Sequence, residues 1–276
     1  MSSARPTPFL QSMRLPRLQL FELEDQPWLP HLLRCGITDY LATMTERTRP
    51  YEAVLPSLTI AVEQTPNPLV RDFCSGGGGP WPALLPALTS AVPGARLELT
   101  DAFPNQQALS RFPAQRAVTY RNAAFEARDS WPADASLATF FSAFHHFAPA
   151  QAAEILRQAS LSHTPVAIFE VTQRSLKALA FLCLVPLAVL VMTPTIRPFR
   201  WWRLLLTYVV PVLPMAAWWD GVVSCWRTYH PDELLALATR AAPSGMEWRV
   251  GEWWTPGQPL PVTYLLGTPT SARQSG

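Results

Sequence analysis

The residues most suited to chemistry surround a run of four glycines. The segment Asp72–Gly79, with the sequence DFCSGGGG, lies between a short apolar run and a segment of helical composition. Glycine loses more backbone freedom on folding than any other residue, so four in succession indicate that something must approach a bare backbone. A loop without side chains lets backbone N–H groups and a helix N-terminus contact a ligand directly. The segment is therefore a candidate binding loop.

Two common glycine loops fit this segment poorly. A Walker A loop ends in Gly-Lys-Ser/Thr, whereas Pro80 and Trp81 follow here, which argues against nucleoside triphosphate hydrolysis. The dinucleotide fingerprint G-x-G-x-x-G finds its first pair in Gly76 and Gly78. Trp81 occupies the third position, where close helix–strand packing needs a small residue. An NAD-dependent oxidoreductase is disfavoured but stays open as an alternative.

A second polar group is the segment FFSAFHHFAP, which contains Ser142, His145 and His146. A histidine with a pKa near its ordinary value of about 6.5 suits general base catalysis, so one of the pair is expected to line a substrate opening as base or wall. Packing, or capping of the next helix, is the alternative role. Adjacent side chains are expected to point apart, so no metal site is predicted for the pair.

Strand-like and helical runs alternate from residue 67 onward. Strands are predicted at residues 68–74, 95–101, 117–123, 135–144 and 165–172. Helices are predicted at residues 80–92, 105–112, 149–162 and 229–241, and a closing β-hairpin at 247–254 and 261–268. Such alternation predicts right-handed crossovers and a largely parallel sheet of the α/β class. Ligands of such sheets bind at the carboxyl ends of the strands, where the glycines stand.

The glycine segment resembles motif I of the class I S-adenosylmethionine-dependent methyltransferases. That motif has an acidic residue at a strand end and then small residues at two-residue intervals, which Asp72, Cys74, Gly76 and Gly78 match. Cys74 departs from the glycine often found there but is still small. The resemblance implies a loop around the methionine part of the cofactor, with Gly76 and Gly78 facing it.

Later strand ends extend the resemblance, which covers residues 66–173 and 228–268. It implies that Asp101 holds the ribose hydroxyls, and that Asn122, where the family more often has Asp, lies near the adenine with Ala123 beside it. The loop after the fourth strand, with Ser142, would face the transferable methyl group. The implied fold is a Rossmann-like, doubly wound, mostly parallel seven-stranded sheet with an antiparallel C-terminal hairpin. Glu170, at the end of the fifth strand, would face the pocket or pair with an arginine.

Three regions follow from this assignment. Residues 67–173 and 224–270 form the cofactor-binding domain, and residues 1–66 form a helical extension that begins with a loose segment up to about residue 16. The extension contains one amphipathic helix, and a second helix after Tyr51. Residues 174–223 are an apolar helical insertion.

The insertion holds two apolar segments, 178–192 and 204–219, separated by the sequence RPFRWWR. Each is shorter than the roughly 20 residues of a spanning helix and contains proline. Arginine interleaved with tryptophan suits an anionic membrane surface. We expect residues 176–223 to dip into the near leaflet as a monotopic hairpin. A lid buried over the pocket and a two-span anchor are the alternatives.

Composition limits the remaining choices. Hydrophobic residues make up 49% of the chain and charged residues 15%, with a net charge of +2, which gives no electrostatic case for nucleic acid. The four cysteines are far apart without a C-x-x-C pair, so neither a disulfide framework nor a zinc site is expected. The N-terminal segment lacks a signal-peptide core, so a cytoplasmic protein is expected. The sequence thus predicts a methyltransferase that uses S-adenosylmethionine on a hydrophobic, lipid-like acceptor; a non-catalytic membrane adaptor is the second alternative.

Overall fold

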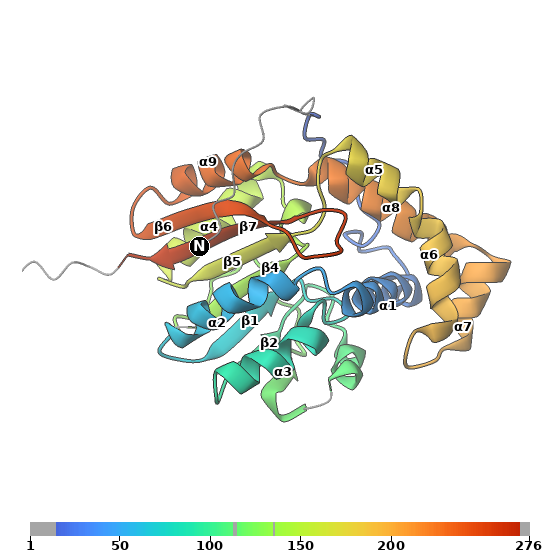
Figure 1. Cartoon of the computed structure of the whole chain (residues 1–276), viewed down its shortest axis with the longest axis horizontal. Coiled ribbons are helices and arrows are strands. Elements are labelled where there is room, and N and C mark those ends of the chain that lie inside the picture. The colour runs from blue at the N-terminus through green and yellow to red at the C-terminus, as the bar shows by residue number, and fades with distance from the viewer. Residues whose placement is uncertain (1–14, 113–114, 135, 271–276) are drawn as a thin grey trace, which may run out of the picture.

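The computed structural model describes residues 15–112, 115–134 and 136–270, so the predicted loose segment lies almost wholly outside the described residues. Within them the chain forms one seven-stranded sheet with the order β3-β2-β1-β4-β5-β7-β6 (Figure 1). The strands are β1 Leu69–Phe73, β2 Arg96–Leu99, β3 Val118–Tyr120, β4 Leu137–Phe141, β5 Val166–Glu170, β6 Met246–Trp253 and β7 Val262–Pro269. Neighbouring strands are parallel along the part β3-β2-β1-β4-β5 of this order, and β7 runs antiparallel to both β5 and β6. The predicted fold class is confirmed.

Helices follow the predicted alternation with one difference. The α-helices are α1 His31–Thr48, α2 Leu55–Glu63, α3 Trp81–Ala91, α4 Pro149–Leu161, α5 Leu176–Leu182, α6 Val185–Met192, α7 Trp201–Leu204, α8 Val212–Arg227 and α9 Pro231–Ala241. Short 3₁₀ helices are η1 Glu52–Val54, η2 Gln106–Arg111, η3 Gln115–Ala117, η4 Phe144–His146 and η5 Thr193–Thr195, and η6 Leu205–Val209 is a π-helix. The helix predicted at residues 105–112 is the 3₁₀ helix η2.

The sheet is covered on both faces, as expected for parallel strands that carry continuous apolar runs. Helices α2 and α3 pack on one face and bury Leu58, Trp81 and Leu88 against β1 and β2. Helices α4 and α9 pack on the other face, where Ile155 and Leu234 join one apolar cluster with residues of β4 and β5 (Figure 1). Two separate apolar cores therefore hold the sheet and fix the positions of its strand ends.

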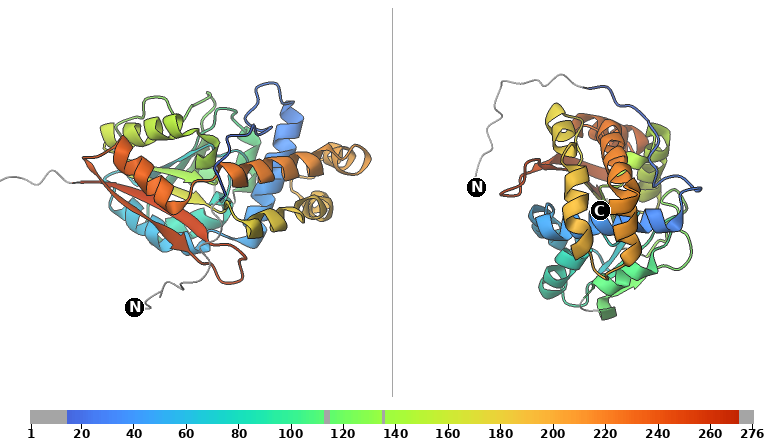
Figure 2. Two further views of the ribbon diagram at one scale, coloured as in Figure 1. Left: turned by 90° about the horizontal axis from the view of Figure 1, so that it is seen from above. Right: turned by 90° about the vertical axis from the view of Figure 1, so that its right-hand side faces the viewer.

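Helix α1 and the insertion form a third apolar core beyond the end of the sheet. Ile37 and Tyr40 of α1 pack with Val189 of α6 and with Leu213 and Ala217 of α8. Helices α6, α7 and α8 project from the rest of the molecule (Figure 2). Helix α8 runs past the predicted boundary at residue 223 and ends at Arg227.

The first apolar segment of the insertion is longer than the sequence suggested. Leu176–Thr195 is one helical run of 20 residues with a mean hydropathy of 2.3, and only 17% of its most apolar stretch is buried. Pro186 does not break this run because it lies in the first turn of α6, where its missing N–H is tolerated. By length and composition this helix could cross a membrane. The second segment is bent by 78° between Val209 and Val212.

Candidate active site

A cavity of about 970 Å³ opens at the carboxyl ends of the parallel strands. One wall consists of the glycine loop, Asp101 and the segment from Ser142 to Phe147. The opposite wall comes from α1, α5, α6 and α8, and includes the apolar side chains of Ile37, Leu41 and Val185. The cavity therefore joins a polar strand-end region to an apolar helical one.

The glycine loop is shaped largely by the protein's own helix α1. A Cβ atom on Gly77 would lie 2.8 Å from Thr38 O and 3.2 Å from Ala42 Cβ, so only glycine permits this contact. Gly76 has a φ of +48° and lines the cavity. Gly78 does not line the cavity. A Cβ atom placed on Gly78 would point to the ring of Phe112 and lie 3.3 Å from it. The expectation that both Gly76 and Gly78 face a ligand is corrected for Gly78.

Asp101 is held against the loop by two backbone N–H groups. Its Oδ2 accepts a hydrogen bond from Gly76 N at 2.8 Å, and its Oδ1 accepts one from Phe103 N at 2.8 Å. Burial raises the pKa of Asp101, although these two hydrogen bonds lower it. Asp101 also lines the cavity. Since each carboxylate oxygen has two acceptor sites, the anchored group can still accept from a ligand hydroxyl.

Asp72 and Cys74 have different positions. Asp72 is buried below the loop, where its oxygens accept hydrogen bonds from Ser75 Oγ and Thr139 Oγ1, both at 2.7 Å, and it does not line the cavity. Burial raises its pKa to about 6. Cys74 lines the cavity with a φ of +56°, and burial raises the pKa of its thiol. Asp72 therefore supports the loop from beneath, whereas Cys74 belongs to the cavity wall.

The predicted neighbours of the adenine lie elsewhere. Asn122 and Ala123 are exposed and do not line the cavity. The chain turns outward after β3 and returns at Phe125, whose N–H donates to Asp101 O at 3.0 Å. The Phe125 ring lies 5.7 Å from Phe73 and under the Arg121 guanidinium. Residues 125–128 therefore line the cavity after β3, whereas Asn122 and Ala123 do not.

His145 is buried and fixed by a carboxylate. Its Nδ1 lies 2.7 Å from Glu170 Oε2, while Glu170 Oε1 accepts hydrogen bonds from Phe144 N at 2.7 Å and His145 N at 3.1 Å. Burial raises the pKa of Glu170, but the neighbouring His145 brings it below the ordinary value. Glu170 thus pairs with a histidine instead of an arginine. The second ring nitrogen, Nε2, is directed toward Glu22 at 3.7 Å.

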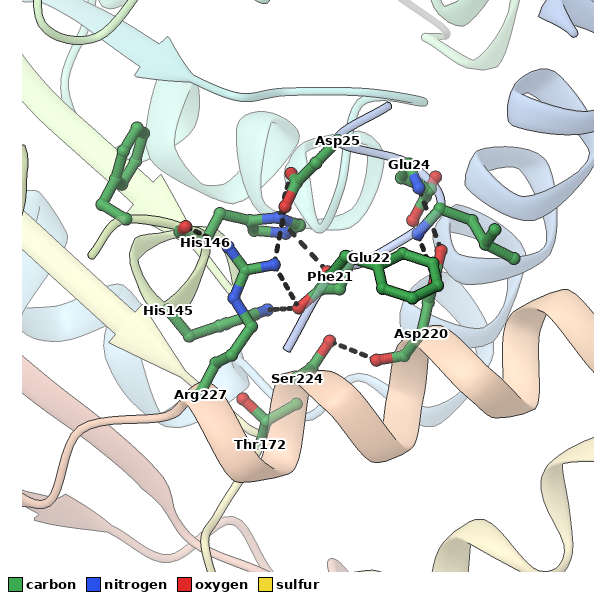
Figure 3. Close-up of polar contacts among 12 residues, drawn as sticks. Phe21, Glu22, Glu24, Asp25, His145, His146, Thr172, Asp220, Ser224 and Arg227 are labelled. Carbon is green, nitrogen blue, oxygen red and sulfur yellow. Dashed lines mark hydrogen bonds and ion pairs between the residues drawn. The ribbon is translucent and has the colours of Figure 1, made fainter. Parts of the chain in front are cut away.

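A segment from the N-terminal extension crosses this region. We name residues 17–25 the strap. Its Asp25 Oδ1 lies 2.7 Å from His146 Nδ1, and its Glu22 Oε2 lies 3.2 Å from the same atom. Arg227, at the end of α8, places Nη1 2.6 Å from Asp25 Oδ2 and 3.3 Å from Glu22 Oε1 (Figure 3). Burial lowers the pKa of His146, but Glu22 and Asp25 outweigh it and raise the pKa to about 10.

Hydrogen bonds also fix Asp220 and Ser142, two further residues that line the cavity. Asp220 of α8 accepts hydrogen bonds from Leu23 N at 2.7 Å and Glu24 N at 3.1 Å, which fixes the strap on α8 (Figure 3). Ser142 lines the cavity with a φ of +45°, but its hydroxyl is already bonded to Tyr51 Oη at 2.7 Å.

The structure brings part of the predicted set together. Six predicted residues line one cavity: Cys74, Gly76, Asp101, Ser142, His145 and His146. Glu22, Asp25 and Arg227 were not singled out, because they lie more than 80 residues from the histidines in the chain. The dense acidic segment FELEDQ was the only signal for Glu22 and Asp25, and nothing in the sequence marked Arg227.

No family model matches the chain, and no curated protein matches it. Solved structures are similar in fold. Human N-acetylserotonin methyltransferase, in complex with S-adenosylmethionine, is 16% identical with a TM-score of 0.45 over 84% of this chain, which spans 56% of the human chain. The plantazolicin methyltransferase BpumL, in complex with S-adenosylhomocysteine, is 11% identical with a TM-score of 0.49 over 87% of this chain and 96% of its own. The S-adenosylmethionine-dependent methyltransferase SibL is 16% identical with a TM-score of 0.48, over 90% of this chain and 61% of its own.

Proposed function

We propose that the chain is an S-adenosylmethionine-dependent methyltransferase. The observation that carries the proposal is the single cavity in which Gly76 and the anchored Asp101 lie on one wall with His145 and His146. A bend without side chains beside a carboxylate suits a nucleoside, because the two carboxylate oxygens can accept hydrogen bonds from the two vicinal hydroxyls of the ribose. The bound cofactor would supply an electrophilic methyl group.

The chain's own residues would position the acceptor. Methyl transfer from a sulfonium is an in-line displacement, so holding the two reactants in line supplies much of the rate enhancement. Glu170 holds His145 Nδ1, so Nε2 is the atom left to contact the acceptor's nucleophile and to take up its proton. Glu170 is a positioning residue in this scheme, because it acts only through the imidazole.

The acceptor is proposed to be hydrophobic and lipid-like. The half of the cavity formed by α1, α5, α6 and α8 is lined by side chains such as Leu41, Phe181, Leu184 and Val185. The same helices carry the exposed apolar surface of the insertion. We infer that the protein lies at the inner face of a membrane through residues 176–223, where an amphiphile would reach the cavity from the apolar side.

Calorimetric titration of the full chain with S-adenosylhomocysteine tests the donor site. Wild type is expected to bind one equivalent, and Asp101→Asn to bind at least tenfold more weakly, since a hydrogen bond to a charged group contributes about 1.5–3 kcal/mol. Asn122→Ala is the matched control, because Asn122 is exposed and outside the cavity. It should bind like wild type.

A parallel titration with NAD separates the proposal from its main rival. If the chain binds NAD but not S-adenosylhomocysteine, the oxidoreductase is favoured. If it binds neither, the non-catalytic membrane adaptor is the alternative that stays open. Equal affinity in wild type and a folded Asp101→Asn would contradict the role given to that carboxylate.

A further inference from the structure

The two adjacent histidines converge on one carboxylate. Their rings stack with centroids 4.5 Å apart and planes inclined by 27°, because the 3₁₀ turn η4 presents both on one side. Ring nitrogens of His145 and His146 and a carboxylate oxygen of Glu22 all lie within 4.8 Å of one another. The expectation that adjacent histidines point apart is therefore wrong here. Two imidazoles and a carboxylate are a common ligand set for Zn²⁺ and Fe²⁺.

Two atoms of this group lack hydrogen bonds. Among the described residues, neither His145 Nε2 nor Glu22 Oε1 has a hydrogen-bond partner, although their side chains are only 2% and 1% exposed. The two atoms face each other at 3.7 Å. Glu22 Oε1 has an ion-pair partner in Arg227 Nη1 at 3.3 Å, so His145 Nε2 is the atom left without a polar partner. Buried polar atoms are nearly always satisfied, so an unsatisfied ring nitrogen that faces a carboxylate indicates a missing binding partner.

The spacing of these atoms suits a small cation. Zinc ligands lie about 2.1 Å from the ion, which places neighbouring tetrahedral ligands about 3.4 Å apart. His145 Nε2 lies 3.7 Å from Glu22 Oε1, and His146 Nδ1 lies 3.2 Å from Glu22 Oε2. Asp25 Oδ1 is hydrogen-bonded to His146 Nδ1 at 2.7 Å, so it becomes a fourth ligand only when the ion replaces the proton between them and the two atoms move apart.

The surrounding groups also resemble the outer shell of a metal site. Glu170 holds His145 Nδ1 at 2.7 Å and so directs Nε2 inward, as in carboxylate–histidine–metal arrangements. Three carboxylates, those of Glu22, Asp25 and Glu170, contact the histidine rings, whereas the guanidinium groups of Arg17 and Arg227 contact the backbone carbonyls of the two histidines.

We propose that Glu22, His145 and His146 bind one divalent transition metal ion, with Asp25 as an additional ligand. Zn²⁺ is the ion that this ligand set and spacing fit best. The imidazoles must be neutral to ligate, so binding releases any proton they hold. If the proposed methyl transfer holds, His145 Nε2 would be a metal ligand and not the base; a bound ion would lower the pKa of the acceptor's nucleophile, whose proton would leave to solvent before the methyl group is transferred.

The test is a titration of chelator-treated full chain with Zn²⁺ alone, followed by calorimetry and by thermal unfolding. The titration is done on a His31→Ala, Cys35→Ser background, because Cys35 Sγ lies 3.5 Å from His31 Nε2 and forms a competing thiol–imidazole pair. One equivalent is expected to bind and to raise the unfolding temperature. Glu22→Gln should weaken binding at least tenfold, and Glu170→Gln by about tenfold to a hundredfold.

Co²⁺ provides a readout that does not depend on the variants folding. The background chain loaded with Co²⁺ should show a visible spectrum of tetrahedral or five-coordinate nitrogen–oxygen ligation, with paramagnetically shifted signals from two imidazoles. Absence of stoichiometric binding, a spectrum with no imidazole signals, or full affinity in a folded Glu22→Gln would each overturn the proposal. Titration with S-adenosylhomocysteine in chelator separates this failure from failure of the donor site, which uses different residues.

Discussion

At the scale of single residues, Asp72 is a charged group in an unfavourable place. Its carboxyl is 2% exposed, and burial raises its pKa to about 6 from an ordinary value near 4. The folded state therefore holds the proton more tightly than the unfolded state. Its stabilising contribution is fully present below about pH 4 and is lost as the pH rises through 6.

This shift gives a pH prediction for Asp72→Asn, which removes the titration and keeps the size. Between pH 4 and pH 7 the unfolding free energy of wild type should fall by up to about 3 kcal/mol relative to the variant, at about 1.4 kcal/mol for each pKa unit. Urea unfolding at several pH values measures the difference. A difference that stays constant with pH would show that Asp72 titrates normally.

At the residue scale, the sequence predicts which residues lie together where neighbouring strands impose the contact. Gly76 and Asp101 stand at the ends of neighbouring strands, so the sheet alone brings them together. Asn122 failed because a strand-end position does not fix where the chain turns next. Glu22 could not be found, because its role depends on how a segment without regular structure crosses α8.

At the scale of elements, a buried ion cluster joins the insertion to the body. Asp39 of α1 pairs with Arg203 of α7 and, through Oδ1 at 3.2 Å, with Arg111 of η2. The side chains of Arg203 and Arg111 are 2% and 6% exposed. Of the arginines that the sequence placed at a membrane surface, Arg203 is therefore used inside the protein.

The cluster predicts an asymmetry between its two partners. Asp39→Asn leaves the buried Arg203 guanidinium without a charge partner and leaves Arg111 only the more distant Glu46, at 3.8 Å, so it should lower the unfolding free energy by about 3–5 kcal/mol. Arg203→Met should cost clearly less, since Asp39 keeps Arg111. Denaturant unfolding compares them, with Arg49→Met, from an exposed pair with Glu52, expected to change stability by at most about 1 kcal/mol. Equal losses for Asp39→Asn and Arg203→Met would contradict this account.

The elements themselves were largely predictable. Strands β1 to β5 follow apolar runs that turn residues interrupt, and such runs leave little choice of structure. The insertion was harder, because runs that are apolar all round lack periodicity and do not show which face is buried. Only packing against α1 decides that Val189 is inside and Val191 outside.

At the scale of the whole molecule, the insertion exposes an unusual amount of apolar surface. Leu184, Leu187, Val191, Trp201 and Val209 are each 57% to 70% exposed. Arg197 and Arg200 are exposed beside them, and both carry the positive charge that anionic headgroups attract. Exposed apolar side chains in this number are the surface that the proposed membrane contact would bury.

Flotation with anionic vesicles tests that inference. Wild type is expected to float, and Leu187→Glu combined with Val191→Glu, one turn apart on α6, should reduce the bound fraction at least tenfold, because each change puts a charge into the apolar layer. Leu161→Glu is the matched control, since Leu161 is 61% exposed but lies on α4. Wild type that stays with the soluble fraction, or equal loss in the control, would exclude the contact.

Helix α8 gives this architecture a mechanical property. Its 16 residues form a rod roughly 24 Å long that begins among the apolar helices and ends at Arg227 beside Asp25. A stiff rod that pivots near its middle by about 10° displaces each end by about 2 Å, enough to separate a bonded pair. A displacement of the outer end would therefore reach Arg227 and its contact with Asp25, as long as α8 stays straight and the strap stays in place.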